Sequence, residues 1–298
     1  MKILVTGSHG LIGSALINRL EKEGHKTYRL VRQTPEPGTG QAFWSPSTQE
    51  IDLSACGQLD AAVHLAGENI ASGRWTAARM ARIRRSRIDG TRLLVSALAA
   101  LDPPPRVLVS ASAIGIYGDR GDEPLTERSA PGKGFLSELC REWEEAAAGA
   151  RRAGIRTVNF RIGLVLSPTG GALAKMLLPF RLGLGGRVGS GHQYMSWIVL
   201  DDLVSACVHC IEQDGIDGPL NAVAPHPVTN REFTKALGTV LGRPTFLPLP
   251  ARIVRLLLGR MADELLLAGA RVEPALLNRS GFNFEKTHIT EALRSVIS

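Results

Sequence analysis

The sequence predicts an α/β protein: a doubly wound parallel sheet with a small, mostly helical lobe at its C-terminal end. Short apolar runs, of the kind that form buried parallel strands, alternate with segments of helical period along most of the chain. Three glycines follow the first apolar run and precede the first helical segment. At 298 residues the chain is long enough for one large core, or for one domain and a half.

The first expected strand ends in a turn that contains Gly7, Gly10 and Gly13, and a helical period begins directly after it. Because glycine has no Cβ, such a turn can be tight and lets a pyrophosphate approach the backbone. The N-terminus of the following helix then offers free N–H groups to the phosphates. Strand, glycine turn and helix together predict a dinucleotide-binding site, with a purely structural glycine turn as the alternative.

The second expected strand, 26–32, ends at Arg32, about twenty residues after the glycine turn, where such a fold meets the adenosine ribose. An acidic residue at this point would bind the ribose 2′-hydroxyl. Arginine instead favours a 2′-phosphate, so the sequence predicts NADP as the cofactor. The alternative is a surface arginine at a strand end.

The next elements continue the alternation of strands and helices. Residues 33–57 are expected to form an irregular connection that contains Pro, Gly and Ser. After the third core strand, the small residues Ala66 and Gly67 would let the backbone lie against the cofactor. The further expected elements are strands at 59–67, 106–118, 156–163 and 219–223, and helices at 76–100, 135–152 and 201–212.

The regular pattern changes toward the C-terminus. Residues 168–197 break into glycine-rich segments, and within them 182–192 is a candidate mobile loop at the rim of an active site. Thr229 is expected to be the N-cap of a helix over 230–241, with Glu232 in the capping-box position. Further apolar helices are expected at 253–258, 262–267 and 289–297.

These patterns divide the chain into a dinucleotide-binding region, 1–225, and a small C-terminal domain, 226–298. Substrates of open α/β sheets bind beyond the carboxyl ends of the strands. We therefore expect the C-terminal domain to cover the nicotinamide end of the cofactor and to complete the substrate side.

The composition is that of a soluble globular protein, with 44% hydrophobic residues and a mean hydropathy of +0.03. No apolar run approaches the roughly 18 residues that span a bilayer, and no basic segment precedes the first strand. We therefore expect a cytoplasmic protein without a membrane partner. Cys207 and Cys210 lie in an apolar helical run and are interpreted as buried small residues, so no metal site is expected.

The net charge of +7 could indicate an acidic partner, and much of the excess lies in the arginine-rich segment 74–87. The simplest interpretation is a solvated helix face. One or two of these arginines could instead reach a bound phosphate. Nucleic-acid binding is disfavoured, because no interleaved aromatic residues and no recognised nucleic-acid motif accompany the run.

Five motifs, in this order, resemble those of the extended short-chain dehydrogenase/reductases, in the branch of the nucleotide-sugar epimerases: GSHGLIG, HLAGEN, SASAIGIYG, FRIGLVL and SWIVLDDLV. The resemblance covers about the first 225 residues. Together with LLPFRLGLGGRVGSGHQYMSWI and PVTNREFTKALGTVLGRPTFLPLP, the motifs are similar to an atypical epimerase-like family with a C-terminal domain of unassigned role.

This resemblance implies a Rossmann fold and binding of NADP. It also implies which residues contact the cofactor: Thr6, Gly7, Ser8, His9, Gly10, Leu11, Ile12, Gly13, Arg32, Leu65, Ala66, Gly67, Glu68, Arg87, Ser110 and Val165.

The chemistry is where the sequence departs from that superfamily, whose general acid/base is a tyrosine with a lysine four residues later. The three tyrosines here are followed at that spacing by arginine, glycine and isoleucine. Ser112 matches the catalytic serine of the superfamily, although one extra residue precedes Tyr117 and puts that match in doubt. Tyr117 is the second catalytic candidate. Further candidates are Lys133 as a cation for Tyr117, and Glu138 or His192 as acid/base groups, each with a structural role as the alternative.

Two functions from different classes fit the sequence. The first is an NADP-dependent oxidoreductase or epimerase that acts on a small carbonyl or sugar-like substrate with non-standard acid/base groups. The second is a non-catalytic NADP-binding protein, regulatory or scaffolding, whose cofactor orders a surface for a partner. The sequence leaves the substrate and a homodimeric assembly open.

Overall fold

The computed structural model describes residues 1–36 and 38–297, and it confirms the doubly wound sheet. The eight strands lie in the order β12-β8-β6-β5-β1-β2-β3-β4, and all neighbours are parallel except the antiparallel pair β3 and β4. The strands are β1 (Lys2–Thr6), β2 (Lys26–Val31), β3 (Gln41–Ser45), β4 (Glu50–Asp52), β5 (Ala61–His64), β6 (Val107–Ala113), β8 (Arg156–Ile162) and β12 (Gly218–Ala222).

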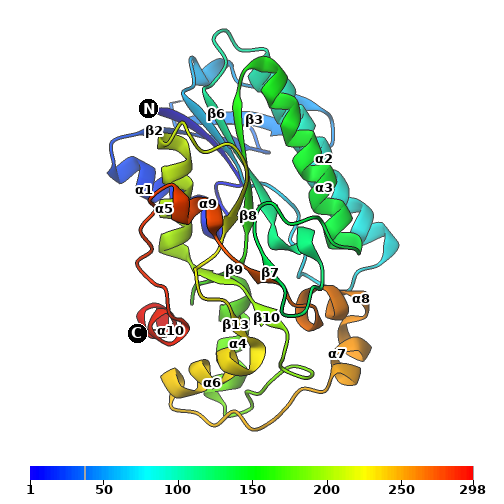
Figure 1. Cartoon of the computed structure of the whole chain (residues 1–298). Coiled ribbons are helices and arrows are strands. Elements are labelled where there is room, and N and C mark those ends of the chain that lie inside the picture. Colours follow the sequence, from blue (N-terminus) through cyan, green and yellow to red (C-terminus); the bar gives the residue numbers. More distant parts are fainter. Residues whose placement is uncertain (37, 298) are drawn as a thin grey trace.

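Helices cover both faces of this sheet (Figure 1). Helices α1 (Leu11–Lys22) and α5 (Leu200–Glu212) pack together on one face, and α2 (Ala77–Ala99) and α3 (Phe135–Ala148) pack together on the other. Successive residues of a strand point to opposite faces, so the apolar run of β1 serves two cores. Ile3 and Val5 join the core under α1 and α5, and Leu4 joins the core under α2.

Strands β3 and β4 lie in the segment 33–57, which was expected to be an irregular connection, so that prediction is wrong for these residues. In β3, Ala42 and Trp44 are buried while their neighbours are half-buried, which is the alternation of a strand with one covered face. Pro and Gly residues on both sides are typical of turns, so this short alternation was not interpreted as a strand. Residue 37, within the same predicted connection, lies outside the described residues.

Other element boundaries differ in detail. Helix α3 ends at Ala148 and tightens into a 3₁₀ turn over Gly149–Ala153, where the sequence predicted one helix to residue 152. The glycine-rich segment 168–197 contains a helix that was not expected, α4 (Gly171–Arg181). The predicted capping box is confirmed: Thr229 accepts from the Glu232 N–H, and the Glu232 carboxylate accepts from the Thr229 N–H.

The C-terminal region interleaves with earlier segments of the chain. Strand β10 pairs with β13, α6 packs against both α4 and α10, and β14 pairs with β7. The predicted boundary at residue 225 stays a prediction. The C-terminal region and the earlier segments around it contain the elements β7 (Pro124–Leu125), β9 (Leu164–Leu166), β10 (Tyr194–Met195), β11 (Trp197–Val199), β13 (Val228–Thr229), β14 (Arg271–Val272), α6 (Asn230–Leu241), α7 (Ala251–Leu258), α8 (Arg260–Ala262), α9 (Ala275–Arg279) and α10 (Ile289–Ile297).

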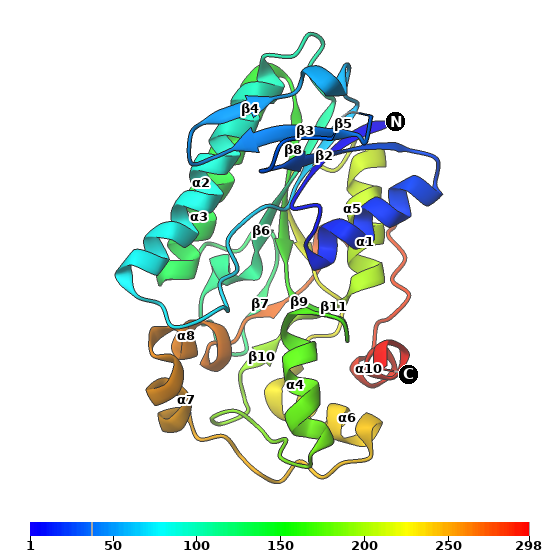
Figure 2. The ribbon, with the colours of Figure 1, turned by 180° about the vertical axis from the view of Figure 1, so that it is seen from behind.

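Most of this helical region lies beyond the carboxyl ends of β6 and β8 (Figures 1 and 2). It is joined to α3 through Glu264, whose carboxylate accepts from the N–H groups of Phe135 and Leu136 at distances of 3.2 and 2.8 Å. Free N–H groups at a helix start carry partial positive charge, so a carboxylate stabilises them. The region therefore sits at the edge where this kind of sheet binds its ligands.

Within the described ranges, no helix combines the length and the apolar character that crossing a membrane requires.

Candidate functional site

The glycine turn lies at the carboxyl end of β1, beside the turn that follows β5. Gly7 has a φ of +69°, and a Cβ on it would lie 2.8 Å from the carbonyl carbon of Leu65. A Cβ on Gly13 would lie 2.2 Å from the Gly7 carbonyl oxygen. Only glycine fits these two positions. Gly10 is the N-cap of α1 and provides no side chain to cap it, so the helix start is open to an external anion.

Thr6 joins the two turns. Its hydroxyl oxygen accepts from the N–H groups of Leu65 and Ala66, both at 3.1 Å, and it lies 2.7 Å from Nδ1 of His64. Nε2 of His64 lies 2.9 Å from the hydroxyl oxygen of Thr91 on α2. The backbone after β5 is thus fixed by a chain of buried side chains beneath it.

The hydrogen bonds of Thr91 determine the form of His64. The Thr91 hydroxyl donates its one proton to the Arg87 carbonyl at 2.6 Å and accepts from the indole N–H of Trp143 at 3.0 Å. Thr91 can therefore only accept from His64, which places the imidazole proton on Nε2 and leaves Nδ1 to accept from Thr6. Burial, helped by nearby Arg87, lowers the pKa of His64 to about 4, so the ring is neutral.

Arg87 lies under the turn that contains Gly67. Its Nη1 donates to the Glu68 carbonyl at 3.0 Å, and its guanidinium carbon lies 5.0 Å from the centre of the Trp143 ring. A Cβ on Gly67 would approach that guanidinium carbon to 3.3 Å. Burial lowers the pKa of Arg87 from its ordinary value. The turn after β5 thus rests on the guanidinium group of Arg87.

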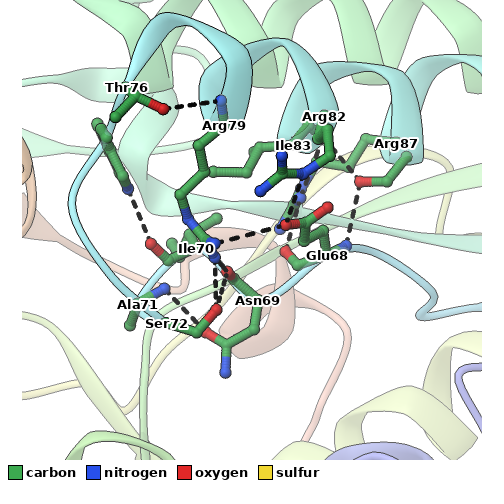
Figure 3. Close-up of polar contacts among 12 residues, drawn as sticks. Glu68, Asn69, Ile70, Ala71, Ser72, Thr76, Arg79, Arg82, Ile83 and Arg87 are labelled. Carbon is green, nitrogen blue, oxygen red and sulfur yellow. Dashed lines mark hydrogen bonds and ion pairs between the residues drawn. The ribbon is translucent and has the colours of Figure 1, made fainter.

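Two arginines of the basic segment bind the loop that follows this turn (Figure 3). Arg79 and Arg82 form ion pairs with Glu68 at 3.7 and 3.6 Å. Arg79 also donates to the Asn69 carbonyl at 2.7 Å and to the Ser72 hydroxyl. These arginines therefore hold the chain's own loop in place, which is a more specific role than the solvated face expected from the sequence.

Two other predicted cofactor residues, Ser110 and Arg32, have polar groups without a partner among the described residues. The Ser110 hydroxyl is buried in β6 and makes no hydrogen bond to any described residue, and the Asn159 side-chain oxygen, in register with it on β8, has none either. Arg32 directly follows β2, is exposed, and has no ion pair within 1–36 and 38–297. Buried polar groups are normally paired, so the Ser110 hydroxyl and the Asn159 oxygen are available to bond a ligand.

Most of the predicted cofactor residues lie in or directly after β1, β2, β5 and β6. We call the place where the strand order reverses, between the turns that follow β1 and β5, the crease. Ser8 and His9 contact each other within the glycine turn, at 3.2 Å. Ile12 and Val165, on β9, pack against the core that contains β1. A Cβ on Gly170, beside α4, would lie 3.3 Å from the Leu11 side chain.

The reaction half of the site, as predicted by the sequence, begins at Ser112 on β6. Its hydroxyl donates to Oε1 of Glu144 at 2.7 Å. Arg161 on β8 binds both oxygens of the same carboxylate, each at 2.8 Å. Burial alone would lower the pKa of Arg161, but its bonds to Glu144 and Tyr117 outweigh that effect and raise it. The Arg161 guanidinium and the Glu144 carboxylate thus form a closed, two-pronged ion pair.

Tyr117 extends this network away from solvent. The side chain is 0% exposed, and its hydroxyl accepts from Nη1 of Arg161 at 2.8 Å. The same hydroxyl lies 2.7 Å from the Asn221 oxygen and 3.1 Å from the Thr126 carbonyl oxygen, and it donates its one proton to the nearer of them. Burial raises the pKa of Tyr117, and Arg161 partly opposes this. These are the contacts of a buried structural phenol, and nothing in them brings its proton to a substrate.

Cys140 and Glu144 are the residues that the sequence reasoning missed. They have the four-residue spacing expected of the tyrosine and lysine, and both belong to α3. The Cys140 thiol is buried beside Ser112, and burial, with Glu144 nearby, raises its pKa to about 12. The spacing C-x-x-x-E after an expected catalytic serine was the available signal. This thiol stays protonated at neutral pH.

The remaining acid/base candidates lie outside the network. Lys133, Glu138 and His192 are exposed, and in the part of the chain that the structure describes their side chains make no hydrogen bond or ion pair with Ser112 or Tyr117. Cys207 and Cys210 are buried free thiols on α5. Within the same ranges, no three His, Cys, Asp or Glu side chains gather in a metal-binding arrangement.

The fold and the glycine crease define a dinucleotide-binding α/β protein. Residues 3–222 match the model of the "NAD dependent epimerase/dehydratase family", and residues 249–296 match a "Domain of unknown function (DUF1731)". The chain belongs to the NAD dependent epimerase/dehydratase family.

Relatives along the whole chain agree with this assignment. The epimerase family protein Mb2239 of Mycobacterium bovis is 45% identical over 98% of this chain and 96% of its own length. The epimerase family protein SDR39U1 of Homo sapiens is 38% identical over the full length of both chains.

The solved structures include human SDR39U1 (isoform 2) with NADPH, which superposes with a TM-score of 0.90 and 37% identity over 99% of each chain. The UDP-glucose 4-epimerase of Thermotoga maritima, with UDP-glucose, superposes with a TM-score of 0.78 at 19% identity, over 99% of this chain and 97% of its own. At that identity the likeness shows the fold alone.

Proposed function

We propose that this chain binds NADP(H) in the crease between β1 and β5. The observation that carries the proposal is the crease itself: Gly7 and Gly13 leave room for no side chain, and the start of α1 behind them is uncapped. The relative of known structure that was solved with NADPH superposes along almost the whole of this chain, which supports the same ligand here.

In this proposal, the N–H groups at the start of α1 bind the pyrophosphate, and the turn Leu65–Gly67 lies along the cofactor. Ser110 gains a partner for its unpaired hydroxyl, and Arg87 supplies a cation beneath the turn. Arg32, which has no carboxylate partner in the described ranges, binds the ribose 2′-phosphate.

We further propose that the chain is an oxidoreductase or epimerase for a small carbonyl or sugar-like substrate, with hydride exchange as the chemistry that the bound dinucleotide supplies. Ser112 donates its only proton to Glu144, so the lone pairs of its oxygen are left to accept a proton from a substrate hydroxyl. In this step the serine passes its own proton to Glu144, against the stabilisation that the ion pair with Arg161 gives the carboxylate. Ser112 and Glu144 are the proton-accepting groups in this proposal, and Tyr117 has no part in it.

A second function is favoured by the closure of the same network. Ser112 is only 2% exposed, the Cys140 thiol is protonated, and Tyr117 is fully buried. A non-catalytic protein that binds NADP(H) in order to present an ordered surface needs nothing more than the crease. Turnover decides between the two functions: reduction of NADP+ with a panel of small alcohols and sugars, or interconversion of sugar epimers followed by NMR, supports the enzyme, and tight binding without either reaction supports the second function.

Cofactor choice is tested by calorimetric titration of NADPH and NADH into the wild type and Arg32→Ala. One charge-assisted hydrogen bond contributes about 1.5–3 kcal/mol, so NADPH should bind roughly 10- to 150-fold more tightly than NADH. Arg32→Ala should remove most of this preference and leave NADH binding unchanged. Arg29→Ala is the matched control, because Arg29 lies on β2, just before Arg32 in the chain, but pairs with Glu21. Equal affinities in the wild type would contradict the role of Arg32.

A further inference from the structure

A second basic site lies in the C-terminal region, away from the dinucleotide crease. A hollow of about 370 Å³ opens between α6, the loop before β10 and the segment after α6. It is lined by Arg187, Arg231, Thr234, Lys235, Thr245, Phe246 and Pro248. None of these residues belongs to the crease between β1 and β5.

The three cations of this hollow have no carboxylate partner among residues 1–36 and 38–297. Arg231 and Lys235 stand four residues apart on α6, so their side chains project from one face of the helix. Arg187 comes from the opposing loop, and its Nη1 donates to the Ser190 carbonyl at 2.9 Å.

The acid nearest in sequence does not neutralise them. The Glu232 carboxylate bonds to Thr229 instead. Its Oε2 accepts from the Thr229 N–H at 2.7 Å and from the Thr229 hydroxyl at 2.8 Å. The carboxylate is therefore used in capping α6. No acidic residue lines the hollow. Like charges four residues apart on a helix repel each other, so an anion in the hollow would stabilise this arrangement.

The apolar part of the lining is equally unpartnered. Phe246 is 72% exposed, although a phenyl ring of this size normally lies in the core. The ring borders the hollow together with Pro248, while Thr234 and Thr245 contribute hydroxyl groups. The site thus offers cations and hydroxyls beside an exposed aromatic surface.

We propose that this hollow binds a phosphate-bearing molecule with a flat, apolar body. The guanidinium groups of Arg187 and Arg231 are suited to the oxygens of a phosphate, and Lys235 adds a third charge. The body of the ligand lies against Phe246. This site is independent of the proposed NADP(H) crease, and the ligand is recognised by its phosphate and its apolar surface together.

Phenyl phosphate is the probe, with inorganic phosphate and phenol as its two parts. It is titrated into the full chain with and without saturating NADPH, by calorimetry at low salt. Arg231→Ala and Lys235→Ala should each weaken phenyl phosphate about tenfold or more, the scale of one lost charge-assisted bond. Lys235→Arg should restore most of the affinity. Phe246→Ala should weaken phenyl phosphate but leave inorganic phosphate unchanged.

Arg243→Ala is the matched control, because it removes the same charge from an exposed arginine that does not line the hollow. Its affinity for the probe should equal that of the wild type. Wild-type binding that is insensitive to Arg231→Ala and Lys235→Ala, or an absence of binding, would overturn the proposal. Binding that NADPH abolishes and these variants leave intact would place the probe in the crease and would also overturn it.

The same phosphate chemistry could come from a lipid headgroup. Sedimentation with phosphatidylglycerol vesicles separates the two sources. Pelleting that is lost in Arg231→Ala assigns the hollow to a lipid phosphate, and binding of phenyl phosphate without pelleting assigns it to a soluble ligand. Either result supports the phosphate site.

Discussion

Ser110 and Ser112 lie two residues apart on the same face of β6, yet their hydroxyl groups have opposite surroundings. The Ser110 hydroxyl has no partner in the described residues, and the nearby start of α1 is likewise uncapped. The Ser112 hydroxyl is bonded to Glu144, which in turn is held by Arg161. One end of the crease is open to a ligand, and the other is closed on itself.

This difference separates two uses of buried polar groups. A buried polar group that binds a ligand has no partner within the protein, which lowers the stability of the fold. A buried polar group that bonds to another side chain instead fixes the local structure. The dinucleotide half therefore carries the signature of a binding site. The reaction half carries that of a structural network, and the experiments below test how far its contacts stabilise the fold.

The largest effect is expected for Arg161→Met. The substitution leaves the Glu144 carboxylate buried without its partner, which typically lowers the free energy of unfolding by about 3–5 kcal/mol. Urea denaturation measures the loss. The double variant Arg161→Met/Glu144→Met should lose less than the single one, because no buried charge remains.

The control for this variant is Arg120→Met, which breaks an ion pair to the half-exposed Glu123. Such surface pairs contribute about 0–1 kcal/mol. An Arg161→Met variant no less stable than this control would mean that the reaction half is not closed as described.

A somewhat smaller effect is expected from the acid titration of His64. The folded-state pKa of about 4 lies below the ordinary value of 6.5, so the unfolded chain takes up the proton first as the pH falls. The stability from His64 is complete above pH 6.5 and is lost as the pH falls toward 4, by an amount on the order of 3 kcal/mol.

This dependence is measured as the free energy of unfolding against pH, for the wild type and His64→Gln. The variant should lose less stability over the same interval, whereas His192→Gln, at an exposed histidine, should follow the wild type. Parallel curves for the wild type and His64→Gln would show that the chain beneath the cofactor turn does not hold His64 neutral.

The smallest effect is expected for Tyr117→Phe. Loss of the hydroxyl leaves the buried Asn221 oxygen without this donor, and such a loss typically costs about 1–3 kcal/mol in stability. Affinity for NADPH should not change, and Tyr194→Phe is the control, since its hydroxyl makes no hydrogen bond to any other residue within 1–36 and 38–297. A drop in kcat of about 100-fold without loss of stability would instead make Tyr117 a general acid.

The sequence by itself determined the features that depend on steric contacts and hydrogen bonds between residues close together in the chain. Gly7, Gly10 and Gly13 predicted the tight turn before α1, because close approach of backbone segments excludes a Cβ. Thr229 and Glu232 predicted their capping box, because both partners lie within one turn of the helix. In each case the interacting groups are neighbours in the chain, so spacing alone contains the information.

The tertiary structure decided what the remaining candidates do. Tyr117, Glu144, Arg161 and Asn221 come from four separate elements, and only the packing of α3 and β12 around β8 brings them together. No spacing in the sequence records that packing. Whether a phenol or a carboxylate is free for chemistry depends on partners distant in sequence, since burial and pairing set its pKa and its access to a substrate.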